Sequence, residues 1–168
     1  MLATSTLITT LASAQEKSPE FKMLDRLVGS WKFEFGEGPT RSTGEFKAEW
    51  ILDGRFVQKK GFIKGPDGNV VKTTSLVTYL PDEKKFRTWS FMSNGTTNVG
   101  TATWDSKRKV LNETRKDDQF IVTTTTDWSR ENEDTWTMVF KNKDSKKVMF
   151  QIKGKATKTG SSDSKKRR

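Results

Sequence analysis

The chain of 168 residues contains no cysteine and no histidine. These two absences exclude disulfides, thiol nucleophiles, imidazole general bases, and zinc or haem sites built on either residue. Proline is scarce, and no apolar run is long enough to cross a membrane as a helix. An all-carboxylate metal site stays open as an alternative, but the acidic residues do not follow the spacing of a calcium loop. No metal or cofactor is predicted.

Aromatic residues carry the hydrophobic content of this chain. Only 32% of the residues are hydrophobic, but six are Trp and eleven are Phe, and each large ring buries a large area. The length is that of one domain with its own core. The formal net charge of +10 predicts a well-solvated surface. No basic residues cluster with aromatic ones along the strands, so no specific nucleic-acid site is predicted.

The two ends of the chain differ from its body. Residues 1–14 carry no charged side chain and end in Ala12-Ser13-Ala14, a small-x-small pattern typical of a signal-peptidase site. This predicts a signal-peptide remnant and export to the periplasm or the medium. A plain N-terminal extension of a cytoplasmic protein is the alternative, since the basic start of a signal is absent. Residues 159–168 are predicted to be a disordered basic tail.

A short helix is predicted before the first strand. Ser18 suits the capping position and Pro19 the first helical position. Apolar residues then repeat on one face as far as Val28, and Gly29 is suited to end the helix. Such a short helix is not stable alone, so it must pack against the rest of the domain.

From Ser30 onward the sequence predicts only strands joined by turns. In the clearest hairpin, Asp53-Gly54 lies between two aromatic strands and predicts a two-residue type I′ turn. About ten strands follow one another without an intervening helix. We therefore predict an all-β fold, an antiparallel up-and-down β-barrel over 18–158, because closure removes both sheet edges. A sandwich is the alternative. The predicted strands span 31–35, 46–52, 56–63, 70–79, 86–92, 96–104, 109–115, 119–128, 135–141 and 147–157.

Several motifs carry a family resemblance. The Gly29-Ser30-Trp31 start after a helix resembles lipocalins and other calycins, in which the Trp packs across the closed end of the barrel. Further motifs resemble the bacterial domain-of-unknown-function 1579 (DUF1579) family over about 23–158, although the closing strand 154–158 departs from its pattern. The resemblance implies a lipocalin-like barrel, often exported, with no settled activity. Nitrobindin-like barrels hold haem through a His that this chain lacks. The motifs are Leu27 to Trp31, Glu49 to Phe56, Trp89 with Asn94-Gly95-Thr96, and Gly100 with Trp104-Asp105.

Candidate ligand residues follow from the barrel interpretation. The six Trp residues are first of all predicted core, but a ten-strand barrel can leave a cavity lined by aromatic and polar side chains. Arg55 could bind a carboxylate or phosphate, or could form an ion pair with Glu49 or Asp53. Gly29 and Trp31 are predicted to be structural. The predicted ligand-binding residues are Arg55, Gln58, Trp50, Trp89, Arg87 and Thr124, with Lys60, Thr126 and Arg115 as weaker candidates.

The sequence favours a binding barrel for a small lipophilic or amphipathic molecule. An enzyme on the same barrel is the alternative, with acid–base groups drawn from Glu49, Asp53 or Tyr79. That alternative requires two of these groups to meet inside the barrel. No catalytic residue is assigned, and binding of an anionic surface or nucleic acid would depend on the basic tail.

Overall fold

The computed structural model describes residues 18–159. The predicted signal-peptide remnant lies outside these residues. So does the tail predicted over 159–168, except for Thr159, which belongs to the last strand. None of the described helices is long and apolar enough to cross a membrane.

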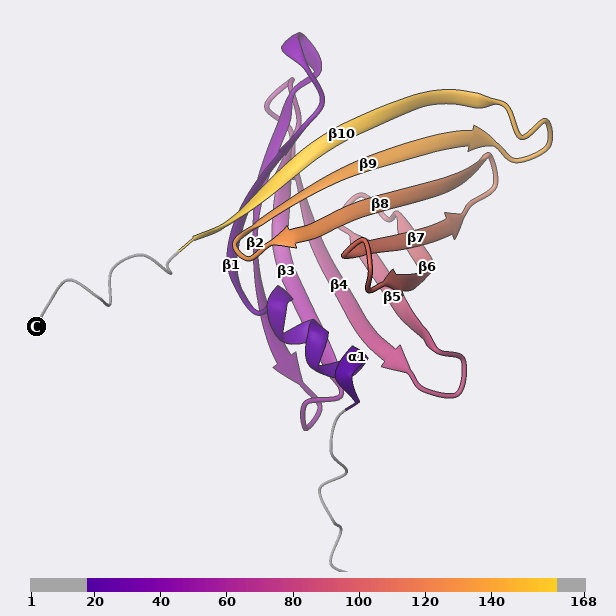
Figure 1. Cartoon of the computed structure of the whole chain (residues 1–168). Coiled ribbons are helices and arrows are strands. Elements are labelled where there is room, and N and C mark those ends of the chain that lie inside the picture. The colour runs from indigo at the N-terminus through magenta and orange to yellow at the C-terminus, as the bar shows by residue number, and fades with distance from the viewer. Residues whose placement is uncertain (1–17, 160–168) are drawn as a thin grey trace, which may run out of the picture.

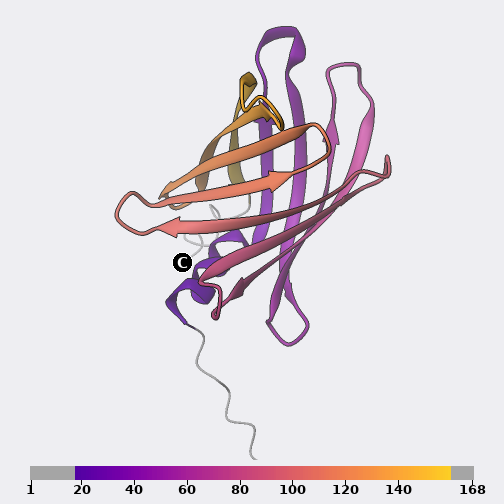
Figure 2. The ribbon, with the colours of Figure 1, turned by 90° about the vertical axis from the view of Figure 1, so that its right-hand side faces the viewer.

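Ten antiparallel strands form a closed barrel, as predicted (Figure 1). Each strand pairs with its neighbours in sequence, and the first strand also pairs with the last, which closes the sheet. Figure 2 shows that the later strands cross the earlier ones steeply on the opposite side of the barrel. The strands are β1 (Gly29–Phe35), β2 (Ser42–Ile51), β3 (Phe56–Lys64), β4 (Val70–Leu80), β5 (Lys85–Met92), β6 (Thr97–Asp105), β7 (Val110–Lys116), β8 (Phe120–Arg130), β9 (Glu133–Asn142) and β10 (Val148–Thr159).

The N-terminal helix is shorter in its α-helical part than predicted. One turn, α1 (Pro19–Lys22), continues as a 3₁₀ helix, η1 (Met23–Leu27). Its buried residues Phe21, Leu24 and Leu27 are three apart, and a 3₁₀ helix places such residues on one line. The predicted cap is confirmed, because the Ser18 hydroxyl oxygen accepts a hydrogen bond from the Phe21 N–H at 3.3 Å.

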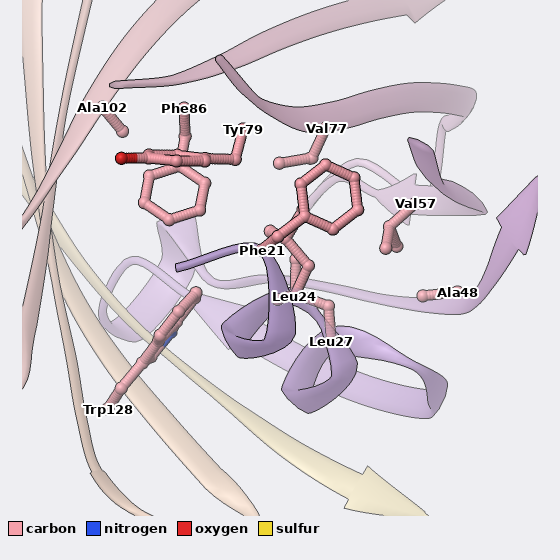
Figure 3. Close-up of a cluster of buried hydrophobic side chains, with 10 residues drawn as sticks. All are labelled: Phe21, Leu24, Leu27, Ala48, Val57, Val77, Tyr79, Phe86, Ala102 and Trp128. Atoms are coloured by element: carbon pink, nitrogen blue, oxygen red, sulfur yellow. The ribbon is translucent and has the colours of Figure 1, made fainter. Parts of the chain in front are cut away.

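This helical segment covers one end of the barrel, which we call the closed end. Figure 3 shows its apolar side chains pointing at inward-facing residues of the strands. Trp31 is 1% exposed, and its indole N–H donates to the Leu27 carbonyl at 2.9 Å. Trp31 therefore packs across the closed end beneath the helical segment, as the resemblance to calycins implies. The strand residues of this core are Ala48, Val57, Val77, Tyr79, Phe86, Ala102 and Trp128.

The turn between β2 and β3 differs from the prediction. Ile51 pairs with Phe56, so four residues, and not two, form the loop. Leu52, Asp53 and Gly54 all take positive φ, at 50°, 54° and 73°. The Asp-Gly pair thus has the predicted left-handed conformation, but in a longer loop.

Candidate functional site

Strand alternation decides which side chains point into the barrel. Figure 3 shows Val57, Val77, Phe86 and Ala102 directed towards the helical segment. Side chains two residues further along a strand return to the same face, and directly paired residues of neighbouring strands share that face. The register therefore assigns a set of polar residues to the interior, and we call this set the polar wall. Its members are Lys59, Ser75, Thr88, Ser90, Glu113, Arg115 and Thr124.

Glu113 and Arg115 extend from β7 in opposite directions. The Glu113 carboxylate crosses β6 and accepts a hydrogen bond from the Thr88 hydroxyl of β5 at 2.5 Å. The Arg115 guanidinium crosses β8 and donates to the Met138 sulfur of β9 at 3.5 Å. These contacts keep the two opposite charges apart, although they belong to neighbouring inward positions of one strand.

Lys59 brings a second positive charge to the interior, from β3. Its Nζ lies 5.5 Å from the centre of the Phe46 ring. Burial lowers the pKa of Lys59 below its usual value of 10.5, and the carboxylates of Glu113 and Asp134 partly oppose this by raising it. In the barrel order these carboxylates lie on strands four places away on either side of β3. We infer that the amine extends towards the middle of the barrel.

The three charged side chains of the polar wall are not neutralised by one another. Within residues 18–159, no ion pair involves Lys59, Glu113 or Arg115. The ion pair at the closed end is a separate one, in which Arg26 lies 2.6 Å from Asp134. A charged group facing a protein interior normally has a partner, because an unpaired one is costly to desolvate. The polar wall can therefore accept an oppositely charged group from a ligand.

An aromatic wall faces the interior from β1, β2 and β9. Phe33 lies at its centre, with ring centroids 6.3 Å from Phe35, 6.1 Å from Phe46 and 6.4 Å from Trp136. These four residues, which we call the aromatic wall, give the interior an apolar side and a polar side.

A second group of rings lies where β8 begins, β9 ends and β10 begins, at the end away from the helix. Phe140 and Phe150 stack at 4.3 Å, and Phe120 meets each of them at 6.0 Å. The register places Phe140 and Phe150 on the inner face, and Phe150 is 46% exposed. Exposed aromatic rings at a barrel opening are suited to receive an apolar molecule.

Solvent reaches the polar wall but not the closed end. Val57 is 0% exposed and Phe86 is 2% exposed beside the helical segment. Two residues further along the same strands, Lys59 and Thr88 are only partly buried although they face inward. Glu113, Arg115 and Thr124 are partly buried as well. These inward-facing side chains are therefore accessible to solvent, whereas those beside the helical segment are not.

Of the predicted ligand residues, Thr124 and the weaker candidates Arg115 and Thr126 face the interior. Trp50 faces inward only at the closed end, where it stacks on Phe21 at 5.5 Å and its N–H donates to Asp25 at 2.7 Å. It is part of the contact between the helical segment and the sheet.

The other predicted ligand residues lie outside the interior. Arg55 is exposed in the loop at the closed end, and its carbonyl accepts from the Thr78 hydroxyl at 2.7 Å. Arg87 points outward and donates to Glu83 at 3.1 Å. Trp89 packs against Phe56 at 6.1 Å on the outer face. Gln58 and Lys60 share the outer face of β3, because Val57 and Lys59 occupy the inner one.

The groups considered for acid–base chemistry do not meet inside the barrel. Glu49 is exposed and lies 3.4 Å from Lys47, and no ion pair within residues 18–159 joins it to Arg55. Asp53 is exposed in the loop. Tyr79 is 8% exposed and packs against Phe86 at 5.0 Å, and burial raises its pKa.

Two grooves lie on the outer surface of the barrel. The first is lined mainly by exposed side chains of both charges, including Lys32, Glu34, Glu45 and Lys64. The second runs over β8, β9 and β10 beside Asp127. Among residues 18–159, no group of three or more acidic residues could hold a metal ion.

Sequence reasoning missed Lys59 and Glu113 as interior residues. Val57 could have marked the inner face of β3, because side chains alternate along a strand and Val57 is an apolar residue on the face opposite Gln58. This signal was ambiguous because both faces of β3 carry apolar residues, with Phe56 and Phe62 on the outer face. Hydrophobicity alone therefore does not mark the inner face of this strand.

Comparisons with known proteins agree with this architecture. No curated protein matches the chain. An S-type phycobiliprotein lyase, CPES from Guillardia theta, superimposes with a TM-score of 0.62 at 11% identity, covering 83% of this chain and 92% of that one. Rv2717c from M. tuberculosis does so with a TM-score of 0.62 at 12% identity, covering 85% and 99%. At these identities the likeness shows the fold alone.

The family model described as "Protein of unknown function (DUF1579)" matches residues 16–164. This match covers most of the chain and extends beyond 23–158 at both ends, so it confirms the resemblance of the motifs. The chain belongs to the DUF1579 family, here with a closed, lipocalin-like barrel of ten strands.

Proposed function

We propose that the barrel binds a small amphipathic molecule with an anionic group inside its interior. The observation that carries this proposal is the Arg115 guanidinium, which faces inward, is partly solvent-exposed and has no carboxylate partner within residues 18–159. Its planar fork of N–H donors suits a carboxylate or phosphate. The Thr88 hydroxyl holds the Glu113 carboxylate away from this position.

The rest of the ligand is assigned to apolar surfaces. The aromatic wall accepts an apolar body, and the Phe120, Phe140 and Phe150 rings receive it at the opening. Thr124 lies between Glu113 and Met138 in the register, close to the path of the Arg115 side chain, and supplies a hydroxyl. Mostly apolar sites with a few orienting polar groups are typical of small-molecule binding. The phycobiliprotein lyase named above shows that a protein with a named activity can have this fold.

The experiment compares two ligands that differ only in their head group, dodecanoate and dodecanol. Their binding to the full chain is measured by the quenching of Trp fluorescence. Arg115→Met should weaken the binding of dodecanoate about 10- to 100-fold, because a hydrogen bond to a charged group contributes about 1.5–3 kcal/mol. Its affinity for dodecanol should stay close to that of the wild type.

Lys116→Met is the matched control, because Lys116 is the next residue of β7 and is exposed on the outer face. It should bind both ligands as the wild type does. Unchanged dodecanoate affinity in Arg115→Met, or an equal loss in Lys116→Met, would rule out the interior anion site.

A further inference from the structure

Lys59 is an unusual residue in the interior. Its amine lies over the Phe46 ring, and in the described part of the chain no carboxylate is within ion-pair distance of it. An anion-binding lysine would normally keep its full positive charge. Here burial acts against that charge and lowers the pKa of Lys59. A larger fraction of this amine is therefore neutral than for a lysine with the usual pKa of 10.5.

A lysine amine with a lowered pKa is a nucleophile that forms imines with carbonyl compounds. The surroundings of Lys59 fit this chemistry better than they fit simple anion binding, for which Arg115 is present. The Phe46 ring covers one side of the amine, and Ser75, its pair on β4, is hydrogen-bonded to Ser90 at 2.9 Å. The Ser75 and Ser90 hydroxyls are neutral, so they add no charge to the part of the polar wall beside Lys59.

We propose that Lys59 forms a reversible imine with the aldehyde or ketone group of an amphipathic ligand inside the barrel. This inference rests on the proposed use of the interior as a ligand site and adds a covalent step to it. The nitrogen lone pair of the neutral amine adds to the carbonyl carbon, and one proton passes from the nitrogen to the oxygen. The resulting carbinolamine then loses water, which leaves a carbon–nitrogen double bond. No oxidation or reduction is involved.

The carboxylates of Glu113 and Asp134, which partly oppose the lowering of the Lys59 pKa by burial, would also stabilise the protonated imine. The imine nitrogen becomes positively charged when it takes up a proton, and the charges of Glu113 and Asp134 stabilise positive charge at this position. The hydrogen bond from Thr88 fixes Glu113 on the polar wall, so this counter-charge is in place before a ligand arrives.

The test uses dodecanal as the probe, with sodium cyanoborohydride to reduce any imine to a stable secondary amine. The full chain is labelled at neutral pH with less aldehyde than protein, and the modified lysine is located by fragment mass spectrometry. Lys59 should carry most of the adduct, ahead of exposed lysines. Lys60 is the internal comparison, because it is the next residue but lies on the outer face and is exposed.

Two variants complete the experiment. Lys59→Arg should lose the main adduct while Lys60→Arg keeps it, and circular dichroism checks that both are folded. An adduct spread over surface lysines, with Lys59 labelled no more than Lys60, would overturn the proposal. Non-covalent binding of dodecanol to the same wild-type sample tests the interior ligand site separately from imine formation at Lys59. If dodecanol binds without preferential labelling of Lys59, the imine is refuted and the interior ligand site stands, whereas absence of both refutes both.

Discussion

The Glu113 carboxylate occupies the space that a side chain at Gly100 would need. A Cβ atom at position 100 would stand 2.5 Å from Glu113 Oε1 and 2.7 Å from the Thr88 hydroxyl. Gly100 is buried on β6, between the strands that carry these two residues. The absence of a side chain at position 100 thus allows a carboxylate of β7 to bond with a hydroxyl of β5.

Gly100→Ala should therefore destabilise the barrel through crowding. Inserting a methyl group into a packed site costs about 1–3 kcal/mol. Urea unfolding of the variant measures the loss. In a Glu113→Ala background the nearest obstacle is gone, so the same substitution should cost clearly less. An equal cost in both backgrounds would mean that the Glu113 carboxylate does not fill this space.

The ion pair of Arg26 and Asp134 joins the helical segment to β9. The Arg26 guanidinium donates to the Asp134 carboxylate, and also to the backbone carbonyls of Arg130 and Glu133. Burial raises the pKa of Asp134 even though Arg26 opposes this, so desolvation is the stronger influence on this carboxyl. The ion pair therefore holds the helical segment against β9, although burying the Asp134 carboxylate costs desolvation free energy.

Arg26→Met should lower the free energy of unfolding by about 3–5 kcal/mol, because it leaves a buried carboxylate without its partner. The exposed pair of Arg41 and Glu34, at 2.8 Å, provides the contrast. Arg41→Met should cost less than about 1 kcal/mol, as is usual for surface pairs. Denaturant unfolding of the two variants decides the matter, and similar losses would contradict the anchoring role.

The sequence predicted the fold better than the site, for a physical reason. Helix capping at Ser18, the position of Trp31 and the strand pattern are local or strongly periodic features. The contents of the interior depend on strand parity, and both faces of β3 are apolar in part. Gln58 was therefore predicted inside, where the structure has Lys59. Which charges remain unpaired depends on contacts between strands, such as that from Thr88 to Glu113.

Lys59 should make stability depend on alkaline pH. Its pKa in the folded state lies below 10.5, so between that lowered pKa and 10.5 the unfolded chain binds more protons than the folded one. Stability should then rise with pH across this window. Lys59→Met should remove this rise and should be more stable than the wild type at neutral pH, because no charge has to be desolvated.

Lys60→Met is the control for this pH series. Lys60 is exposed, so its replacement should leave the stability close to that of the wild type. Tyr79, whose pKa is raised, also titrates at alkaline pH, but it is present in all three proteins and cancels in the differences. Parallel stability curves for the wild type and Lys59→Met would show that Lys59 is not desolvated.

Trp31 tests the closed end of the barrel directly. Its ring is 1% exposed, stacks on Phe46 at 6.0 Å and lies under Lys158, whose Nζ is 5.7 Å from the ring centre. Its indole N–H also fixes the last turn of the helical segment through the Leu27 carbonyl. Truncation to Ala removes these contacts together and leaves a cavity between the helix and the sheet. The expected loss is about 3–5 kcal/mol, a large part of the roughly 5–15 kcal/mol by which a typical domain is stable.

Lys32→Ala is the matched substitution on the other face of β1. Lys32 is exposed and lies 3.5 Å from Glu45, a surface pair that contributes at most about 1 kcal/mol. Chemical denaturation should therefore show a barely folded Trp31→Ala protein beside a nearly unchanged Lys32→Ala protein. Because Trp31 holds the helical segment in place, Trp31→Ala should also expose the amides of residues 19–27 to hydrogen exchange before those of the strands. Equal and small losses in both variants would mean that the helical segment does not depend on Trp31 to cover the barrel.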